Sequence, residues 1–233
     1  MIPIKRALSS SIGRKFVMSL SGIGLVLFVI VHLLGNLTLL VPDGGDMFNT
    51  YAYNFETLGP LLYLVEMGLL AVIIVHIVFG VTVSLKNRSA RAKGYDQNIK
   101  TKGGPSRLSA ASRNMFITGG LLGAFIFAHL LHFRVAKMFI GEKTMVGDTE
   151  MTDLYAMVLD AFASPIIVAI YVAAALALGF HLRHGFWSAF QSLGTMKPEW
   201  SKGFYTLGYI IAVLLAVGFV GIPIYLFAIQ LGG

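Results

Sequence analysis

Five long apolar segments decide what this chain of 233 residues can fold into. They cover about residues 16–41, 60–85, 115–133, 165–190 and 204–231. A helix needs about 20 apolar residues to cross the hydrocarbon core of a bilayer. Only helices and closed barrels satisfy their backbone hydrogen bonds in lipid, and these segments lack the alternating pattern of barrel strands. We therefore expect residues 1–233 to form a single all-α membrane domain with five transmembrane helices.

The composition excludes a soluble enzyme. Charged residues make up 12% of the chain and hydrophobic residues 56%, whereas a soluble domain carries about 25% charged residues. The chain has no cysteine, which excludes disulfides, thiolate nucleophiles and cysteine-ligated iron–sulfur or zinc sites. Any cofactor must therefore be held by other side chains.

Prolines mark the predicted starts of two helices. Gly59-Pro60 and Ser164-Pro165 each place a proline in a first helical turn, where its missing N–H costs nothing, and Ser164 is a candidate N-cap. The first segment is too long for a signal peptide, and no Ala-x-Ala-like site follows it. We therefore expect it to persist as a helix of the mature protein.

Lysine and arginine are divided unequally between the two ends of the predicted helices. Fifteen of the 18 lie in the N-terminal tail, the 86–113 loop and the 183–202 region, and the others are Arg134, Lys137 and Lys143. Because the cytoplasmic loops of membrane proteins carry the excess of basic residues, this predicts a multi-pass protein of the cell inner membrane with a cytoplasmic N-terminus. The net charge of +7 is thus a topology signal, and no stacking platform accompanies it to indicate a nucleic-acid partner.

All of the histidines fall within the apolar segments or at their margins. They are His32, His76, His129, His132, His181 and His184. Helices that alternate in direction and rise about 1.5 Å per residue place His32 and His129 about 21–24 Å from the inner face. The same arithmetic places His76 and His181 about 14 Å from that face. Four predicted helices thus contribute one histidine each, in two pairs at two depths.

Two pairs of histidines at two depths predict two b-type haems, each iron held by two imidazoles from facing helices. Zinc would need three or four ligands at one point. A neutral imidazole also avoids burying a charge. His132 and His184 lie three residues from stronger candidates, and we interpret them as interfacial or supporting residues, although either could replace its neighbour as a ligand.

Small residues accompany the histidines in a repeated pattern. Gly80 follows His76 and Gly185 follows His181 by four positions, where a glycine leaves room for a flat macrocycle. Ser-Gly and Thr-Gly pairs precede His32 and His129 by the same 11 positions. Helices one and two therefore resemble helices three and four as a weak internal repeat.

These motifs together resemble the cytochrome b membrane anchor of succinate dehydrogenase and fumarate reductase, in its single-chain, five-helix, two-haem form. The features that carry the resemblance are Ser21-Gly22 with His32, His76-x-x-x-Gly80, Thr118-Gly119 with His129 and Arg134, and His181-Leu-Arg-His-Gly-Phe-Trp-Ser188 with Gly194. The resemblance implies a proximal haem on His76 and His181 and a distal haem on His32 and His129. It also favours His181 over His184 and His129 over His132.

The resemblance implies a place in electron transport. A flavoprotein subunit would exchange electrons with succinate or fumarate, an iron–sulfur subunit would pass them on, and this chain would carry them through its haems to a membrane quinone, usually menaquinone. The chain lacks cysteine, a dinucleotide fingerprint and a soluble domain. Succinate chemistry would therefore belong to partner subunits on the cytoplasmic face.

Two acidic residues are the candidates for quinone chemistry, which needs a proton donor and acceptor beside the quinone. Glu56 lies at the outer mouth of the second predicted helix and Glu66 within its outer half. The haem propionates would need cationic or hydroxyl partners at the inner side. The candidates are Lys15, Ser19, Arg113 and Arg183.

Two alternatives remain open from the sequence. One is a di-haem cytochrome b anchor of another respiratory enzyme, such as a hydrogenase or a formate dehydrogenase. The other is a haem-free transporter in which the histidines relay protons. The sequence shows no inverted repeat of the kind typical of such transporters.

Overall fold

The computed structural model describes residues 10–89, 114–195 and 197–232. Within these residues, five helices are long and apolar enough to cross a membrane, as predicted. They are α2 (Ser11–Asn36), α4 (Pro60–Ser89), α6 (Met115–His129), α9 (Pro165–Ser192) and α10 (Pro198–Leu231). A short 3-10 helix, η1 (Leu37–Leu40), extends α2, and a π-helical turn, η2 (Leu130–Val135), with α7 (Lys137–Ile140) extends α6.

Several helix ends differ from the prediction for identifiable reasons. The first helix begins at Ser11 rather than 16 because the Ser10 side chain accepts a hydrogen bond from the Gly13 N–H at 3.0 Å. The last begins at Pro198 rather than 204 because this proline fits the first turn. The second and fourth run to Ser89 and Ser192. Ser164 occupies the N-cap of α9, but its side chain makes no capping hydrogen bond.

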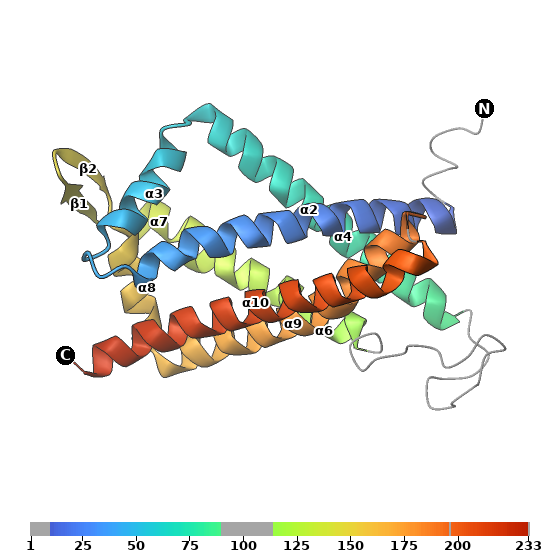
Figure 1. The fold of residues 1–233 in the computed structure, drawn as a ribbon. Helices are drawn as coiled ribbons and strands as arrows, with labels where there is room; N and C mark the ends of the chain where they lie inside the picture. Colours follow the sequence, from blue (N-terminus) through green and yellow to red (C-terminus); the bar gives the residue numbers. More distant parts are fainter. Residues whose placement is uncertain (1–9, 90–113, 196, 233) are drawn as a thin grey trace.

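Short elements between the spans gather at one end of the bundle, which we call the cap end (Figure 1). They are η1, α3 (Asp46–Glu56), the strands β1 (Lys143–Val146) and β2 (Thr149–Thr152), and α8 (Leu154–Phe162). The strands form an antiparallel hairpin with Gly147 at a positive φ of 58° in its turn. The described residues are mostly helical, as the predicted all-α class requires, and this short hairpin is an addition that the apolar segments do not indicate. The opposite end of the bundle is the N-terminal end.

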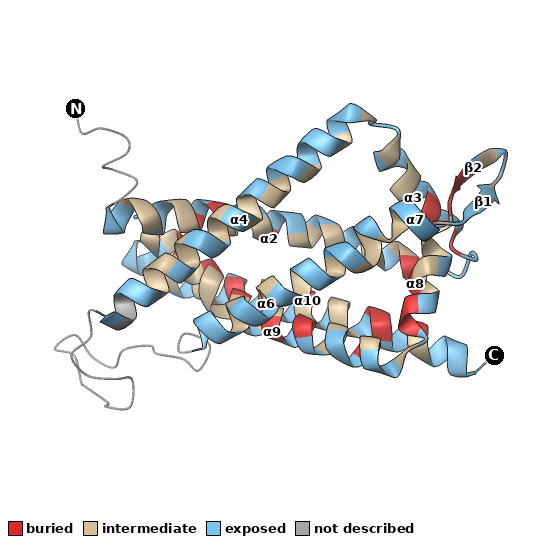
Figure 2. Cartoon of the chain, turned by 180° about the vertical axis from the view of Figure 1, so that it is seen from behind, coloured by how far each residue is buried: buried red, intermediate tan, exposed pale blue. Residues whose placement is uncertain are grey.

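The best-packed part of the bundle is formed by α2, α9 and α10. Buried residues concentrate on these helices and on α8 (Figure 2). Small residues allow α9 and α10 to approach closely, since a Cβ added to Gly179 would lie 2.9 Å from the Ala216 Cβ. By contrast, α4 diverges from α2 toward the cap end (Figure 1). The histidines lie on α2, α4, α9 and the third span.

Candidate functional site

The first histidine pair lies toward the N-terminal end. His76 on α4 and His181 on α9 have ring centres 6.4 Å apart and ring planes inclined by 72°. The second pair joins α2 to the third span, where His32 and His129 have ring centres 5.9 Å apart and planes inclined by 82°. The prediction that His76 lies next to His181 and His32 next to His129 is confirmed. The prediction that these histidines bind iron stays a prediction.

Ser21 and its neighbour Met18 hold the ring of His76. The His76 Nδ1 lies 3.1 Å from the Met18 carbonyl oxygen and 3.2 Å from the Ser21 Oγ. A carbonyl oxygen only accepts hydrogen bonds, so Nδ1 of His76 carries the proton. The Ser21 hydroxyl in turn donates to the carbonyl of Val17 at 2.8 Å, which leaves its oxygen to accept from the imidazole.

Thr118 repeats this arrangement on the other histidine of the pair. Its Oγ1 lies 3.2 Å from the His181 Nδ1 and donates to the carbonyl of Asn114 at 3.1 Å. A hydroxyl that donates to this carbonyl accepts from an Nδ1–H of His181, in the same way that Ser21 accepts from His76. Both histidines therefore present the lone pair of Nε2, which is the tautomer that a metal-ligating histidine adopts when its other nitrogen is hydrogen-bonded.

A glycine beside each hydroxyl makes room for the imidazole. A Cβ added to Gly22 would lie 3.1 Å from the His76 Cε1, and one added to Gly119 would lie 3.3 Å from the His181 Cε1. The predicted Ser-Gly and Thr-Gly repeat is thus real. In the structure it serves His76 and His181, rather than the histidines that follow it on the same helix.

The second pair is surrounded by aromatic rings. His32 stacks on Phe28 with ring centres 5.4 Å apart, and His129 stacks on Phe125 at 5.6 Å. The His129 Nδ1 lies 3.2 Å from the hydroxyl of Tyr171 on α9. Sequence reasoning missed Tyr171, because nothing along the chain shows which histidine a tyrosine of another helix will meet.

The ring separations suit an iron bound between two imidazoles. Two iron–nitrogen bonds of about 2 Å, with the rings collinear, put the ring centres about 6 Å apart, and the observed separations are 6.4 and 5.9 Å. Among the described residues, no three His, Asp or Glu side chains converge as a zinc site would require. Each histidine pair therefore has the ring separation that one iron between two imidazoles would need.

His184 and His132 are not members of these two pairs. The His184 ring centre is 6.4 Å from that of Trp187, whose Nε1 donates to Ser201 at 3.2 Å. His132 stacks on Phe133 with ring centres 4.7 Å apart. These surroundings favour His181 and His129 as the ligands.

The predicted glycines that would border a macrocycle differ from each other. A Cβ added to Gly80 would meet nothing within 4 Å, so this side of α4 is open. One added to Gly185 would contact the Met115 Cε at 3.7 Å. Gly80 therefore meets the expectation of free space, and Gly185 has only the end of a flexible side chain against it.

The candidate propionate partners lie at the N-terminal end, except Arg113, which falls outside the described residues. Ser19 is buried. The Arg183 guanidinium lies over the ring of Tyr209 at 5.4 Å, and its buried Nε has no hydrogen-bond partner in the described part of the chain. An unsatisfied buried donor of this kind suits an anionic ligand group.

A cavity of about 420 Å³ opens at the same end of the bundle, between α2, α4 and α9. Its lining residues are Lys15, Met18, Val83, Ser188, Gln191 and Ser192. Lys15 therefore faces a space shared with Met18, whose carbonyl accepts from His76. The lining provides one cation and several hydrogen-bonding side chains next to the first histidine pair.

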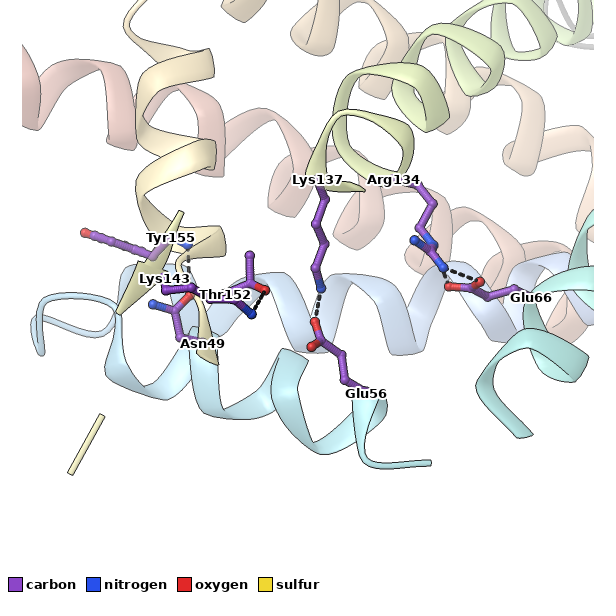
Figure 3. A network of polar contacts seen from close by, with 8 residues as sticks. All are labelled: Asn49, Glu56, Glu66, Arg134, Lys137, Lys143, Thr152 and Tyr155. Carbon is purple, nitrogen blue, oxygen red and sulfur yellow. Dashed lines mark hydrogen bonds and ion pairs between the residues drawn. The ribbon is translucent and has the colours of Figure 1, made fainter. Parts of the chain in front are cut away.

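The two candidate acids near the cap end both pair with cations of the third span (Figure 3). Glu66 accepts two hydrogen bonds from the guanidinium of Arg134, at 2.8 and 2.9 Å. Glu56 forms an ion pair with Lys137. Arg134 lies in the π-helical turn η2, a local irregularity that is often found at functional sites. The structure brings each acid to a cation but not to the other acid.

Comparison with known proteins identifies no relative: no family model, no curated protein and no solved structure matches this chain. What the chain does must therefore be inferred from its own residues.

Proposed function

We propose that this chain is the di-haem cytochrome b membrane-anchor subunit of a succinate:quinone oxidoreductase, that is, a succinate dehydrogenase or fumarate reductase. The observation that carries the proposal is the presence of two histidine pairs on four membrane-crossing helices, with ring centres 6.4 and 5.9 Å apart. A haem bound by two imidazoles supplies one-electron redox chemistry and leaves no iron position open to substrate.

The protein's own groups would bind and orient the two haems. His76 and His181 would hold the proximal haem, and Ser21 and Thr118 would fix their tautomers through the 3.2 Å hydrogen bonds to Nδ1. His32 and His129, which stack on Phe28 and Phe125, would hold the distal haem. Apolar surroundings exclude water and so influence the haem potentials.

Cationic and hydroxyl side chains at the N-terminal end would hold the propionates of the proximal haem. Lys15 lines the cavity beside this pair, and Arg183 has a buried donor without a partner in the described part of the chain. Ser19 is buried on the same end of α2. Arg113 is proposed from the sequence alone.

Succinate or fumarate chemistry would take place in partner subunits. The chain has no cysteine to hold an iron–sulfur cluster, so a flavoprotein and an iron–sulfur protein would dock on its basic face. The charge bias supports a cytoplasmic position for that face and for the N-terminus, and the chain would then lie in the cell inner membrane. Electrons would then pass through the anchor to a quinone in the lipid.

Glu66 and Glu56 would exchange protons with that quinone, which we take to be menaquinone. Glu66 is held by Arg134 and Glu56 by Lys137, so each carboxylate is fixed in place and its charge is balanced. Because both acids lie toward the cap end, the quinone reaction would occur on the side away from the dehydrogenase. Electron transfer across the bilayer would then be coupled to the membrane potential.

The test is a reduced-minus-oxidised spectrum of the purified complex, together with the haem content per chain and the identity of the copurifying subunits. We expect two b haems, a flavoprotein and an iron–sulfur protein. A colourless protein without an α-band on dithionite reduction would overturn the proposal in favour of a transporter. Two haems together with hydrogenase or formate dehydrogenase subunits would support a di-haem cytochrome b. They would overturn the proposal that its partners are the subunits of a succinate dehydrogenase or fumarate reductase.

A further inference from the structure

The hydroxyl of Tyr171 lies between two imidazoles of the third span. Its oxygen is 3.2 Å from the His129 Nδ1 and 3.5 Å from the His132 Nδ1. The Tyr171 ring packs edge-on against Phe125 and Phe162, with ring centres 4.9 and 5.0 Å away. Aromatic packing therefore holds the hydroxyl in its place between the two histidines.

A tyrosine hydroxyl has one proton to donate. When that proton goes to one of two neighbouring Nδ1 atoms, the hydroxyl oxygen accepts from the other. Two directions are possible. Either His129 donates to Tyr171 and Tyr171 donates to His132, or the chain runs the opposite way and His129 carries its proton on Nε2.

Only the first direction prepares His129 to bind a metal through Nε2. A neutral histidine that ligates through this nitrogen must carry its proton on Nδ1. Ser21 and Thr118 achieve the same result at the other pair by donating their protons to carbonyls of their own helix. A tyrosine hydroxyl lies too far from its own backbone for that, so another acceptor must take its proton, and His132 is in position.

We propose that Tyr171, with His132 as the acceptor of its proton, is the positioning residue that holds His129 in the iron-ligating tautomer. The inference rests on the proposed function and assigns His132 a role that differs from ligation. The Nδ1–H of His129 bonded to the tyrosine oxygen makes the imidazole a stronger electron donor to the iron. A hydrogen bond to the imidazole that binds the iron is one of the means by which a protein sets a haem potential.

Tyr171→Phe in the purified complex tests the proposal, because it removes the hydroxyl and keeps the ring. We expect two haems per chain, a higher midpoint potential for one haem and an altered low-spin EPR signal for that haem alone. Tyr225→Phe on α10, whose side chain is 43% exposed, is the matched control and should change neither haem.

His132→Ala tests the second link of the chain. Without its acceptor, the Tyr171 hydroxyl becomes a weaker partner for His129, since hydrogen bonds in series strengthen one another. We expect a smaller rise in the same potential, with both haems retained. Combined with Tyr171→Phe, the alanine should add nothing further, because the two residues act through one hydroxyl.

Unchanged potentials and EPR signals in a two-haem Tyr171→Phe protein would overturn this inference and leave the proposed function standing. Loss of a haem in His132→Ala, together with retention of both in His129→Ala, would identify His132 as the ligand and also overturn it. A wild-type complex without haem would overturn both the inference and the proposed function.

Discussion

Thr118 lies 3.2 Å from the Nδ1 of His181, and Ser21 stands at the same distance from the Nδ1 of His76. Each hydroxyl donates its own proton to a carbonyl one turn earlier on its helix. The same arrangement thus occurs twice in the bundle. In each case a small hydroxyl residue on one helix fixes the tautomer of a histidine on another. These two equivalent hydroxyl–histidine contacts are what the weak sequence repeat corresponds to in the structure.

Thr118→Val should weaken the proximal haem site and leave the distal one intact. The change keeps the shape of the side chain and removes the acceptor for the His181 Nδ1–H, and losing such an outer-shell partner costs about 10–100-fold in metal affinity. Haem retention during dilution, measured by absorbance, checks this. Thr82→Val is the control, since its hydroxyl bonds only the Val78 carbonyl in the described structure, at 2.6 Å. Equal haem retention in the two variants would contradict the assigned role.

Single alanine substitutions should separate the two haems. His76→Ala and His181→Ala are expected to remove the same haem, and His32→Ala and His129→Ala the other, because the members of each pair have neighbouring rings. The pyridine haemochrome assay should fall from two haems per chain to one in every case. His184→Ala, whose ring neighbours Trp187, should keep both. Loss of both haems in a single variant that still folds would argue against independent pairs.

The inclination of the ring planes predicts the EPR signals. Planes at 82° and 72° mean that the two imidazoles of a pair direct their π electrons at different iron d orbitals, which leaves these orbitals nearly equal in energy. We expect both ferric haems to give strongly anisotropic low-spin signals. Rhombic signals of the kind produced by parallel imidazoles would show that the rings turn when haem binds.

Sequence arithmetic could pair the histidines because depth depends only on position along a helix. His32 and His129 are 16 and 14 residues from the same face, and their rings are neighbours in the structure. The same arithmetic cannot show which helix a side chain faces. For this reason the sequence shows Ser21 and Thr118 only as a repeat, whereas their contacts with His76 and His181 depend on how the helices pack.

The sequence does not predict the short helices of the cap end, for a different reason. Helices α3 and α8 have 11 and 9 residues, too few to give the long apolar run by which the membrane spans were recognised. The sequence predicts an end of the third span at 133, yet this span continues to Ile140 through the π-helical turn η2. A π-helical turn follows from packing and leaves no clear pattern in the residue types.

Glu66→Gln should lower menaquinone turnover by about 100-fold or more while both haems remain, if its carboxylate exchanges protons with the quinone. Glu66 also pairs with Arg134, so the single variant could lose activity because Arg134 is left without its partner. Combining Glu66→Gln with Arg134→Gln removes both charges and should rescue a structural defect but not a lost proton carrier. We expect the double variant to be stable and inactive toward quinone. Glu150→Gln on the exposed hairpin is the control.

Asn49→Ala should loosen the cap end without affecting the haems. Asn49 is buried, its Nδ2 donates to the Asp153 Oδ1 at 3.0 Å, and its Oδ1 accepts from the Tyr155 N–H at 2.9 Å. Removing the amide leaves the Tyr155 N–H without its partner, at a cost of about 1–3 kcal/mol, while the Asp153 Oδ1 still accepts from the Ala156 N–H at 2.9 Å. Limited proteolysis should then cut the 141–153 region faster than in the wild type. Asn54→Ala, at an exposed position of α3, should not. Because Asn49 joins α3 to the start of α8, equal cleavage of the two variants would mean that the hairpin and α8 hold the cap end without this amide.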